Sequence, residues 1–288
     1  MKYAIVQEYE GEYSLSLMCR TLSVSRGGYG RWRDRLPSPR SQRREQMTRQ
    51  VKETYKAFKA RYGSRRITDE LKALGYGCST NYIADIMQGA GLKARNGRGF
   101  NYRHHSRTVV NVSENLLWRK FKADVPNQKW TSDITYIWVD NQWLYLATVM
   151  DLYSRRIVGW ALDNTMTEAL TKRALEDALK QRKCEPGLIV HSDRGTQYRA
   201  QKYIDFAEKN GLKLSMSRKG NCWDNAPMES FFSRLKVELI YAKDYRCVQE
   251  AKADIFEYIE IFYNRKRRHS ANGYLSPVAF EEQTVLAA

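Results

Sequence analysis

The chain is poor in the residues that build nitrogen- and sulfur-ligated metal modules. It contains 4 histidines and 5 cysteines among 288 residues, and no two cysteines have CxxC spacing. The odd cysteine count argues against a disulfide framework, so we predict reduced thiols. A structural zinc module and a disulfide-stapled secreted domain are therefore not expected.

Long apolar runs are also missing. The longest apolar stretches span only a few residues, whereas a transmembrane helix needs roughly 20. The N-terminal stretch MKYAIVQEYEGEYS breaks its short apolar run with charges, unlike a signal peptide. We therefore expect a cytoplasmic protein that makes no membrane contact.

Basic residues, by contrast, are abundant. The chain has 49 Lys plus Arg against 32 Asp plus Glu, a formal net charge of +17. Such an excess favours a polyanionic partner, most commonly nucleic acid. Hydrophobic residues make up 42% of the chain, which is enough for a real core, and the length suggests one to three domains.

The first third of the sequence is basic and patterned for helices. In residues 14–35, Leu15, Met18 and Leu22 have helical spacing, and a second helix can start at Ser25. This pattern predicts a small helix-turn-helix. A Pro-Ser-Pro linker and a charged helix over residues 41–61 follow.

Residues 62–95 predict a second helix-turn-helix. Ile67 and Leu71 lie on one face of an amphipathic helix, Gly75 stops it, and Ser79 can cap the next. A plain helical hairpin is the alternative, but the charge favours DNA binding. The side chains expected to contact DNA here are Arg65, Arg66, Asn81 and Tyr82.

The amino-acid composition changes near residue 125, where β-branched and aromatic residues dominate. KWTSDITYIWV (129–139), WLYLATVMDLYS and RRIVGWALD predict three strands in close succession. TEALTKRALEDALKQRK, YRAQKYIDFAEKNGL and MESFFSRLKVELIY predict helices, separated by the short strands LIVHSD and KLSMS. The order β-β-β-α-β-α-β-α predicts a mixed-sheet α/β domain of the ribonuclease-H type.

Three acids occupy informative positions on these elements. Asp133 lies in the middle of the first strand, where an acid opposes strand propensity and therefore indicates function. Asp193 ends the fourth strand, and strand ends host ligands in α/β sheets. Glu229 opens the last helix after Pro227, and Lys236, at i+7, projects from the same side.

Carboxylates in this arrangement suit phosphodiester transfer. Two divalent cations about 3.5–4 Å apart can clamp the attacking and leaving oxygens. Hard cations such as Mg²⁺ take oxygen ligands and keep several waters, so a few carboxylates suffice. Each acid alone would more readily be interpreted as a solvated or capping residue, and only the combination favours catalysis.

The spacing and several strings resemble a known family. Between Asp193 and Glu229 lie 35 residues (229 − 193 = 36 positions), as in the D,D-35-E pattern of retroviral integrases and related transposases. WTSDITYI, VMDLYSRRIVGW, HSDRGTQY, SRKGNCWDNAPMESFFSRLKVEL and YNRKRRHSANGYLSP resemble insertion-sequence transposases, over about residues 125–280. Residues 62–95 resemble the helix-turn-helix before that core. The resemblance is strongest to the second-frame (OrfB) product of the IS-three family.

The resemblance implies a metal-dependent transposase. It implies an RNase-H-like core in which Asp133, Asp193 and Glu229 bind Mg²⁺ or Mn²⁺, two ions per site, and Lys236 contacts terminal DNA. The implied chemistry is hydrolysis to a free 3′-hydroxyl, which then attacks a second phosphodiester. The implied partners are the element's terminal inverted repeats, target DNA, further copies of this chain and an upstream-frame protein. The upstream-frame protein of the family carries a leucine zipper, and this chain shows no leucine-zipper heptads. The implied location is the bacterial nucleoid.

The expected domain organisation combines all-α modules with one α/β core. The predicted segments are a small helix-turn-helix at 1–36, a connecting basic helix at 41–61, a second helix-turn-helix at 62–95, a basic linker at 96–124, the RNase-H-like integrase core at 125–245, and a C-terminal helical extension with a basic cluster at 246–288.

Other polar residues are open to two interpretations. Asp151 could approach Asp133 or serve a local structural role, and Asp224 is expected to shape the loop before the last helix. His191 is expected to be structural, whereas Trp223 could stack on a base or pack in the core. The C-terminal cluster could be a solvated charge run, but with DNA as substrate we expect phosphate contacts from Arg265, Lys266, Arg267 and Arg268.

Two alternatives to a transposase are consistent with parts of the sequence. A non-catalytic DNA-binding regulator would use the basic N-terminal modules but leaves the acids unexplained. A stand-alone RNase-H-type nuclease would keep the active site without targeting to element ends.

Overall fold

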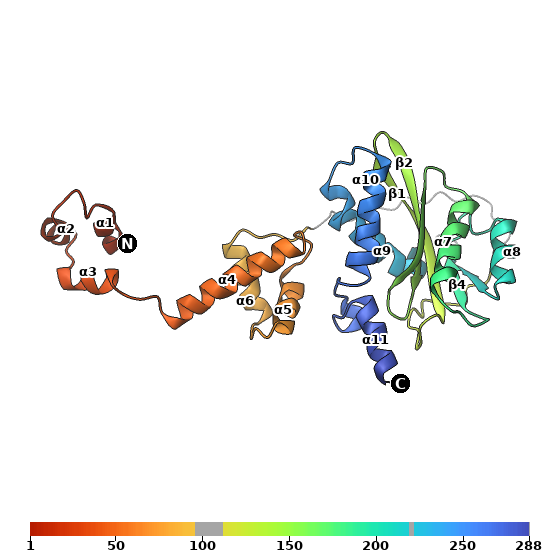
Figure 1. The fold of residues 1–288 in the computed structure, drawn as a ribbon, viewed down its shortest axis with the longest axis horizontal. Helices are drawn as coiled ribbons and strands as arrows, with labels where there is room; N and C mark the ends of the chain where they lie inside the picture. Colours follow the sequence, from red (N-terminus) through yellow and green to blue (C-terminus); the bar gives the residue numbers. More distant parts are fainter. Residues whose placement is uncertain (96–111, 219–221, 288) are drawn as a thin grey trace.

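The computed structural model describes residues 1–95, 112–218 and 222–287 (Figure 1). At the N-terminus, three short helices form a separate unit around Val6, Met18, Cys19 and Tyr29. They are α1 (Lys2–Glu8), α2 (Leu15–Thr21) and α3 (Arg26–Arg33). The serine hydroxyls of Ser14 and Ser25 cap α2 and α3 by accepting backbone N–H bonds. The two predicted helices are confirmed, and α1 is an addition to them.

A second helical unit follows and contains α4 (Pro39–Ala57), α5 (Ser64–Ala73) and α6 (Thr80–Gly89). Ser79 caps α6 by accepting from the N–H of Tyr82, as predicted. Ile67 and Leu71 of α5 are fully buried, which confirms the predicted apolar face. Gly75 has φ +86°, a left-handed conformation that suits glycine, and ends the helix before it.

The α/β domain is built on a five-stranded mixed sheet with the order β3-β2-β1-β4-β5. The strands are β1 (Lys129–Val139), β2 (Gln142–Asp151), β3 (Ile157–Asp163), β4 (Ile189–Ser192) and β5 (Lys213–Met216). The first three form an antiparallel meander, and β4 pairs parallel to both β1 and β5. This arrangement confirms the predicted ribonuclease-H-type order of elements.

Helices cover both faces of the sheet (Figure 1). On one face, α7 (Glu168–Gln181) and α8 (Gln201–Lys209) pack against Trp130, Val149 and Val158. The approach of α7 to β3 requires Gly159, because a Cβ there would lie 2.4 Å from the carbonyl oxygen of Ala174. On the other face, α9 (Ala226–Glu238) packs against β1 and β2.

The C-terminal region adds further helices on the α9 side. They are the 3-10 turns Cys222–Asn225, Ile240–Ala242 and Ser270–Asn272, α10 (Val248–Phe256), a π-helix at Glu257–Tyr263 and α11 (Pro277–Ala287). Glu281 of α11 is buried and pairs with Arg156 and Arg182, which anchors this helix to the sheet domain.

The α4–α6 unit packs on the sheet domain rather than standing apart. One continuous apolar core includes Val51 and Ile67 of this unit together with Phe231 and Tyr258 of the sheet domain. The predicted linker 96–124 is irregular from residue 112, and the rest of it lies outside the described residues.

The described part of the chain also bears on the cysteines and on membrane-spanning helices. Cys19, Cys78, Cys184 and Cys247 are free thiols, as predicted. Within the described ranges, no helix combines the length and apolar character needed to cross a membrane.

Candidate active site

Asp133 lies at the middle of β1, opposite Thr148 of β2. Its side chain is half-buried, and its Oδ1 accepts a hydrogen bond from the N–H of Ile134 at 2.8 Å. Burial raises the pKa of Asp133 well above its usual value, and the charges of Asp193 and Glu229 raise it further. The three predicted acids therefore act on one another electrostatically.

Asp193 follows the end of β4, and the parallel pairing of β4 with β1 brings it to the same part of the sheet as Asp133. Its side chain is exposed, and its Oδ1 accepts from the N–H of Gly195 at 2.8 Å. A Cβ at Gly195 would lie 2.9 Å from that oxygen. The tight turn therefore keeps a glycine next to the carboxylate.

Glu229 lies in the first turn of α9 with Pro227, as the sequence predicts. Lys236 lies two turns further and is 6% exposed, with its Nζ 4.4 Å from the ring centroid of Tyr136. Burial lowers the pKa of Lys236, and the carboxylate of Asp133 opposes that change. The predicted lysine is thus placed within electrostatic range of the first acid.

The donor set suits a hard cation. Like-charged carboxylates that raise the pKa of Asp133 are stabilised by a cation between them. However, no group of three His, Cys, Asp or Glu side chains in the described part of the chain is close enough to hold a metal ion. The acids fit a metal in type and charge but do not form a preassembled cluster.

Two neighbours fix the start of α9 against β1. Thr131, which is fully buried, donates a hydrogen bond from its Oγ1 to Oδ1 of Asn225 at 2.5 Å. The Asn225 amide in turn donates to the carbonyl of Ser132 at 3.4 Å. These bonds connect the strand that carries Asp133 to the helix that carries Glu229.

Asp224 shapes the segment before α9, as predicted. It is 1% exposed and accepts hydrogen bonds from Asn115, from Arg119 and from the backbone and guanidinium of Arg218. The hydrogen bond from the Arg218 guanidinium holds the pKa of Asp224 well below its usual range. Asp224 is a structural ion-pair partner, whereas the side chain of Trp223 lies outside the described residues.

Two other groups near the acids are structural. His191 is fully buried, and its ring nitrogens bond to the hydroxyls of Ser215 and Ser217 at 2.8 and 3.1 Å. Burial lowers its pKa to about 4. Asp151 is fully buried and accepts from the N–H groups of Asn127 and Tyr153. This arrangement matches a local structural role, and burial raises the pKa of Asp151 to about 6.

One further residue near the acids was not predicted. Tyr198 is 1% exposed, and its hydroxyl lies 3.0 Å from Oγ of Ser132. Burial raises the pKa of its phenol, and the charges of Asp133 and Asp193 act in the same direction. Its sequence signal is its place at the end of the HSDRGTQY string, five residues after Asp193.

The predicted DNA-contacting residues divide into two groups. Those at the surface are Arg65, Asn81, Arg265 and Lys266, with Arg66 and Tyr82 half-buried. In contrast, Arg267 is 3% exposed and donates to both carboxylate oxygens of Glu238 at 2.7 and 3.0 Å. Arg268 pairs with Glu70 of α5 at 2.6 Å. The guanidinium groups of Arg267 and Arg268 are therefore engaged in ion pairs within the protein, in contrast to the DNA contacts predicted for them.

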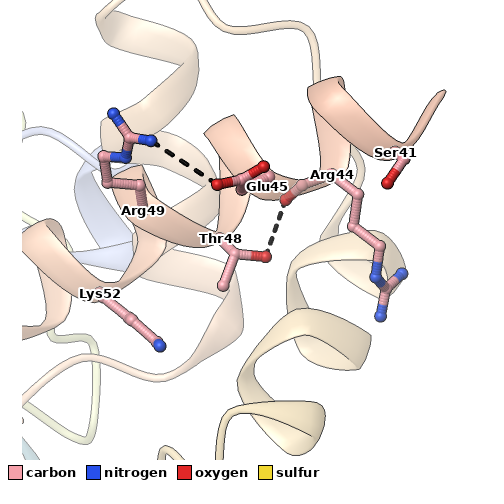
Figure 2. A pocket seen from close by; sticks show the side chains of 6 residues that line it. All are labelled: Ser41, Arg44, Glu45, Thr48, Arg49 and Lys52. Atoms are coloured by element: carbon pink, nitrogen blue, oxygen red, sulfur yellow. Dashed lines mark hydrogen bonds and ion pairs between the residues drawn. The ribbon is translucent and has the colours of Figure 1, made fainter. Parts of the chain in front are cut away.

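A basic hollow lies on the exposed face of α4. Figure 2 shows the side chains that line it, with Arg44, Arg49 and Lys52 projecting from successive turns. Glu45 is the acid of this set and lies 3.9 Å from Arg49, while Arg44 pairs with Asp85 of α6. The hollow, of about 560 Å³, is wide and open, and its net positive charge suits a phosphate backbone.

Comparisons with known proteins place this geometry in a class. Residues 123–222 and 229–285 match two families, each described as an integrase core domain, and residues 42–99 match an HTH-like domain. Among solved structures, the HTLV-2 integrase catalytic core domain in complex with magnesium shares 14% identity. It aligns over 55% of this chain and 98% of its own, with a TM-score of 0.43. The family matches therefore place the α/β domain in the integrase-core class, a class of polynucleotidyl transferases, with an HTH-like domain before it.

Full-length relatives narrow the class further. The transposase InsF of insertion sequence IS3A from Escherichia coli K12 is 43% identical over 99% of this chain and 100% of its own length. An uncharacterized 31 kDa protein of insertion element IS600 from Shigella sonnei is 42% identical over 92% of this chain and 98% of its own. The chain belongs to the IS3-family transposases.

Proposed function

We propose that this DNA transposase cuts DNA at the ends of its own insertion element and joins the freed 3′-hydroxyl to target DNA, with Asp133, Asp193 and Glu229 as the catalytic acids. The observation that supports the proposal is the parallel pairing of β4 with β1, which sets Thr131 opposite His191 and so puts Asp133 and Asp193, each two residues further on, at the same level of neighbouring strands. The charges of Asp193 and Glu229 both act on Asp133. The three acids come from three separate elements: the middle of β1, the end of β4 and the start of α9.

The acids are proposed to hold Mg²⁺ or Mn²⁺, two ions per site. Bound metal would activate water or the 3′-hydroxyl and neutralise charge on the leaving oxygen. The chain's own contribution is the placement of carboxylate oxygens and the exclusion of competing ligands. Because no three-acid cluster is preassembled among the described residues, we expect DNA and metal to bind together.

Lys236 is proposed to contact a phosphate next to the cleaved bond. It projects from the same side of α9 as Glu229, and its charge lies close enough to Asp133 to affect the pKa of both groups. The Lys236 ammonium makes a cation–π contact with the ring of Tyr136. A lysine in this position offers a fixed point charge to the substrate.

Polar and basic residues that are exposed or half-buried in the α4–α6 unit and the C-terminal cluster are proposed to bind the DNA outside the catalytic site. They are Arg65, Arg66, Asn81, Tyr82, Arg265 and Lys266. Joining two element ends to a target requires more than one active site, so we propose assembly of several copies on DNA. We also propose cooperation with an upstream-frame protein, at the bacterial nucleoid.

The proposal is tested with the full chain and a duplex carrying the element's own ends. Glu229→Gln, Asp133→Asn and Asp193→Asn should each abolish strand transfer in Mg²⁺ while leaving duplex affinity within about twofold. Asp163→Asn, a carboxylate at the far end of β3, is the matched control and should retain activity. Strand transfer by purified Glu229→Gln protein at the wild-type rate would overturn the proposal.

The same experiment separates the two alternatives. A non-catalytic regulator would bind the duplex without any metal-dependent cleavage. A stand-alone nuclease would cleave a random duplex as well as one carrying the element ends. The IS3-family relationship over the whole chain favours the transposase.

A further inference from the structure

An arginine-lined pocket lies beside α9, on the flank next to the one that carries Glu229. It has a volume of about 390 Å³ and is lined by residues of α9, the β2–β3 turn, α5 and the C-terminal segment. The basic groups in its wall are Arg66, Arg155, Arg234, Arg267 and His269. Among the described residues that line it, none is acidic.

The cations of the pocket are close enough to repel one another. Burial lowers the pKa of His269 well below its usual value, and the charges of Arg267, Arg66 and Arg155 lower it further. Burial also lowers the pKa of Arg66, with Arg267 acting in the same direction. Arg267 is already paired with Glu238, so the positive charge available to a bound anion is that of Arg66, Arg155 and Arg234.

The walls also hold nitrogen atoms without acceptors. Nη1 of Arg155 and Nε2 of His269 are both buried and make no hydrogen bond within the described chain. Arg155 is otherwise held by the carbonyl of Phe121 through Nη2, and Arg66 by the carbonyl of Arg268. Buried polar groups of this kind normally have a partner.

The pocket lies next to the proposed catalytic acids. Pro227 and Ser230 of its wall flank Glu229 on α9. Met150 of its wall pairs with Thr131 of β1, two residues from Asp133 and therefore about 7 Å along the strand. Arg234 lies one turn beyond Ser230 and is exposed, so it can reach a ligand from solvent.

We propose that this pocket binds a phosphate group, with Arg66, Arg155 and Arg234 as its cationic donors. Guanidinium groups match phosphate oxygens in geometry and charge. The phosphate can belong to a DNA strand that runs past the catalytic acids or to free phosphate. The DNA source rests on the proposed function, whereas phosphate binding itself does not.

The first test measures inorganic phosphate binding to the full chain by thermal melting at constant ionic strength, balanced with chloride. We expect a saturable rise in Tm with phosphate for the wild type. Arg155→Gln and Arg234→Gln should reduce that rise, and Arg234 is exposed, so its replacement should not impair folding. Lys180→Gln, an exposed cation on α7, is the control and should respond like the wild type.

The second test measures affinity for a labelled random duplex as a function of salt. If the pocket takes a DNA phosphate, Arg234→Gln should lower the slope of log K against log salt by about 1, and Lys180→Gln should not. A Tm effect without a slope change assigns the pocket to free phosphate. If both variants match the wild type in both tests, the pocket binds no phosphate and the proposal is wrong. Neither test measures strand transfer, so a failure of the phosphate-pocket proposal can be distinguished from a failure of the proposed function.

Discussion

The hydroxyl of Thr131 donates to the side-chain carbonyl of Asn225 across 2.5 Å, which joins the strand of one proposed catalytic acid to the helix of another. Thr131→Val keeps the shape but leaves Asn225 without its donor. We expect a loss of about 1–3 kcal/mol in the free energy of unfolding, measured by urea titration. We also expect strand transfer to fall more than duplex binding, because α9 is less firmly placed.

A matched control lies on the same strand. Thr135 is 1% exposed, and its hydroxyl has no hydrogen-bond partner in the part of the chain that the structure describes. Thr135→Val should therefore leave the stability unchanged or raise it. Equal losses for the two variants would show that the Thr131–Asn225 bond contributes nothing specific.

The buried pair Glu238–Arg267 predicts a strong and asymmetric mutational response. Arg267→Met leaves a buried carboxylate unpaired and should destabilise the protein by about 3–5 kcal/mol. The double variant Arg267→Met/Glu238→Leu should regain part of that loss. Lys59→Met, which breaks the exposed pair with Glu257, should cost at most about 1 kcal/mol. If Arg267→Met instead left stability intact and lowered the salt slope of DNA binding, Arg267 would be a phosphate contact after all.

Replacing Asp224 is expected to cause a second, smaller loss in the free energy of unfolding. Its carboxylate is buried, but its partners Arg119 and Arg218 are 46% and 41% exposed. Asp224→Asn should therefore cost about 1–3 kcal/mol. Asp163→Asn, at the more exposed pair with Arg173, should cost at most about 1 kcal/mol. Calorimetry of the two variants would contradict this interpretation if Asp163→Asn were the more destabilising.

His269 predicts a pH dependence of stability. Its pKa in the folded chain is well below the unfolded value of about 6.5, because burial and the charges of Arg267, Arg66 and Arg155 disfavour its cation. Below pH 6.5 the unfolded chain gains a proton that the folded chain does not, so stability falls as the pH falls. This group contributes a slope of up to about 1.4 kcal/mol per pH unit.

His269→Asn should remove that slope when unfolding is measured from pH 7 to pH 5. The comparison is a difference between two proteins, because His191 adds a slope of the same sign and Asp151 one of the opposite sign in both. Parallel stability curves for the variant and the wild type would show that His269 titrates normally in the folded state.

The sheet could be predicted from sequence because its strands carry local signals. β1 combines β-branched residues with an alternation that puts Asp133 and Thr135 on one face and Trp130 and Ile134 on the other. The acids could be placed for the same reason, since each lies at a recognisable position within an element. α1 was not predicted, because seven residues with one buried side chain leave little periodicity.

The roles of the C-terminal arginines could not be predicted in this way. The four residues of the basic cluster are alike in sequence, and only the fold distinguishes the exposed Arg265 and Lys266 from the buried Arg267 and the half-buried Arg268. The partner of Arg267 lies 29 residues away and that of Arg268 lies 198 residues away. Tyr198 was missed for a similar reason, because its bond to Ser132 spans 66 residues.

Glu238, the last residue of α9, connects distant parts of the chain. Its carboxylate accepts hydrogen bonds from Arg267 and Tyr258. Its backbone carbonyl accepts hydrogen bonds from two residues of the helical unit, Arg61 just before α5 and Arg95 after α6. Glu229 lies nine residues earlier on the same helix, about 14 Å along its axis. Any rotation of the HTH-like unit against the sheet must either break these bonds or pull on the helix that carries Glu229. We therefore expect the position that the HTH-like unit takes on DNA to affect, through α9, the placement of Glu229.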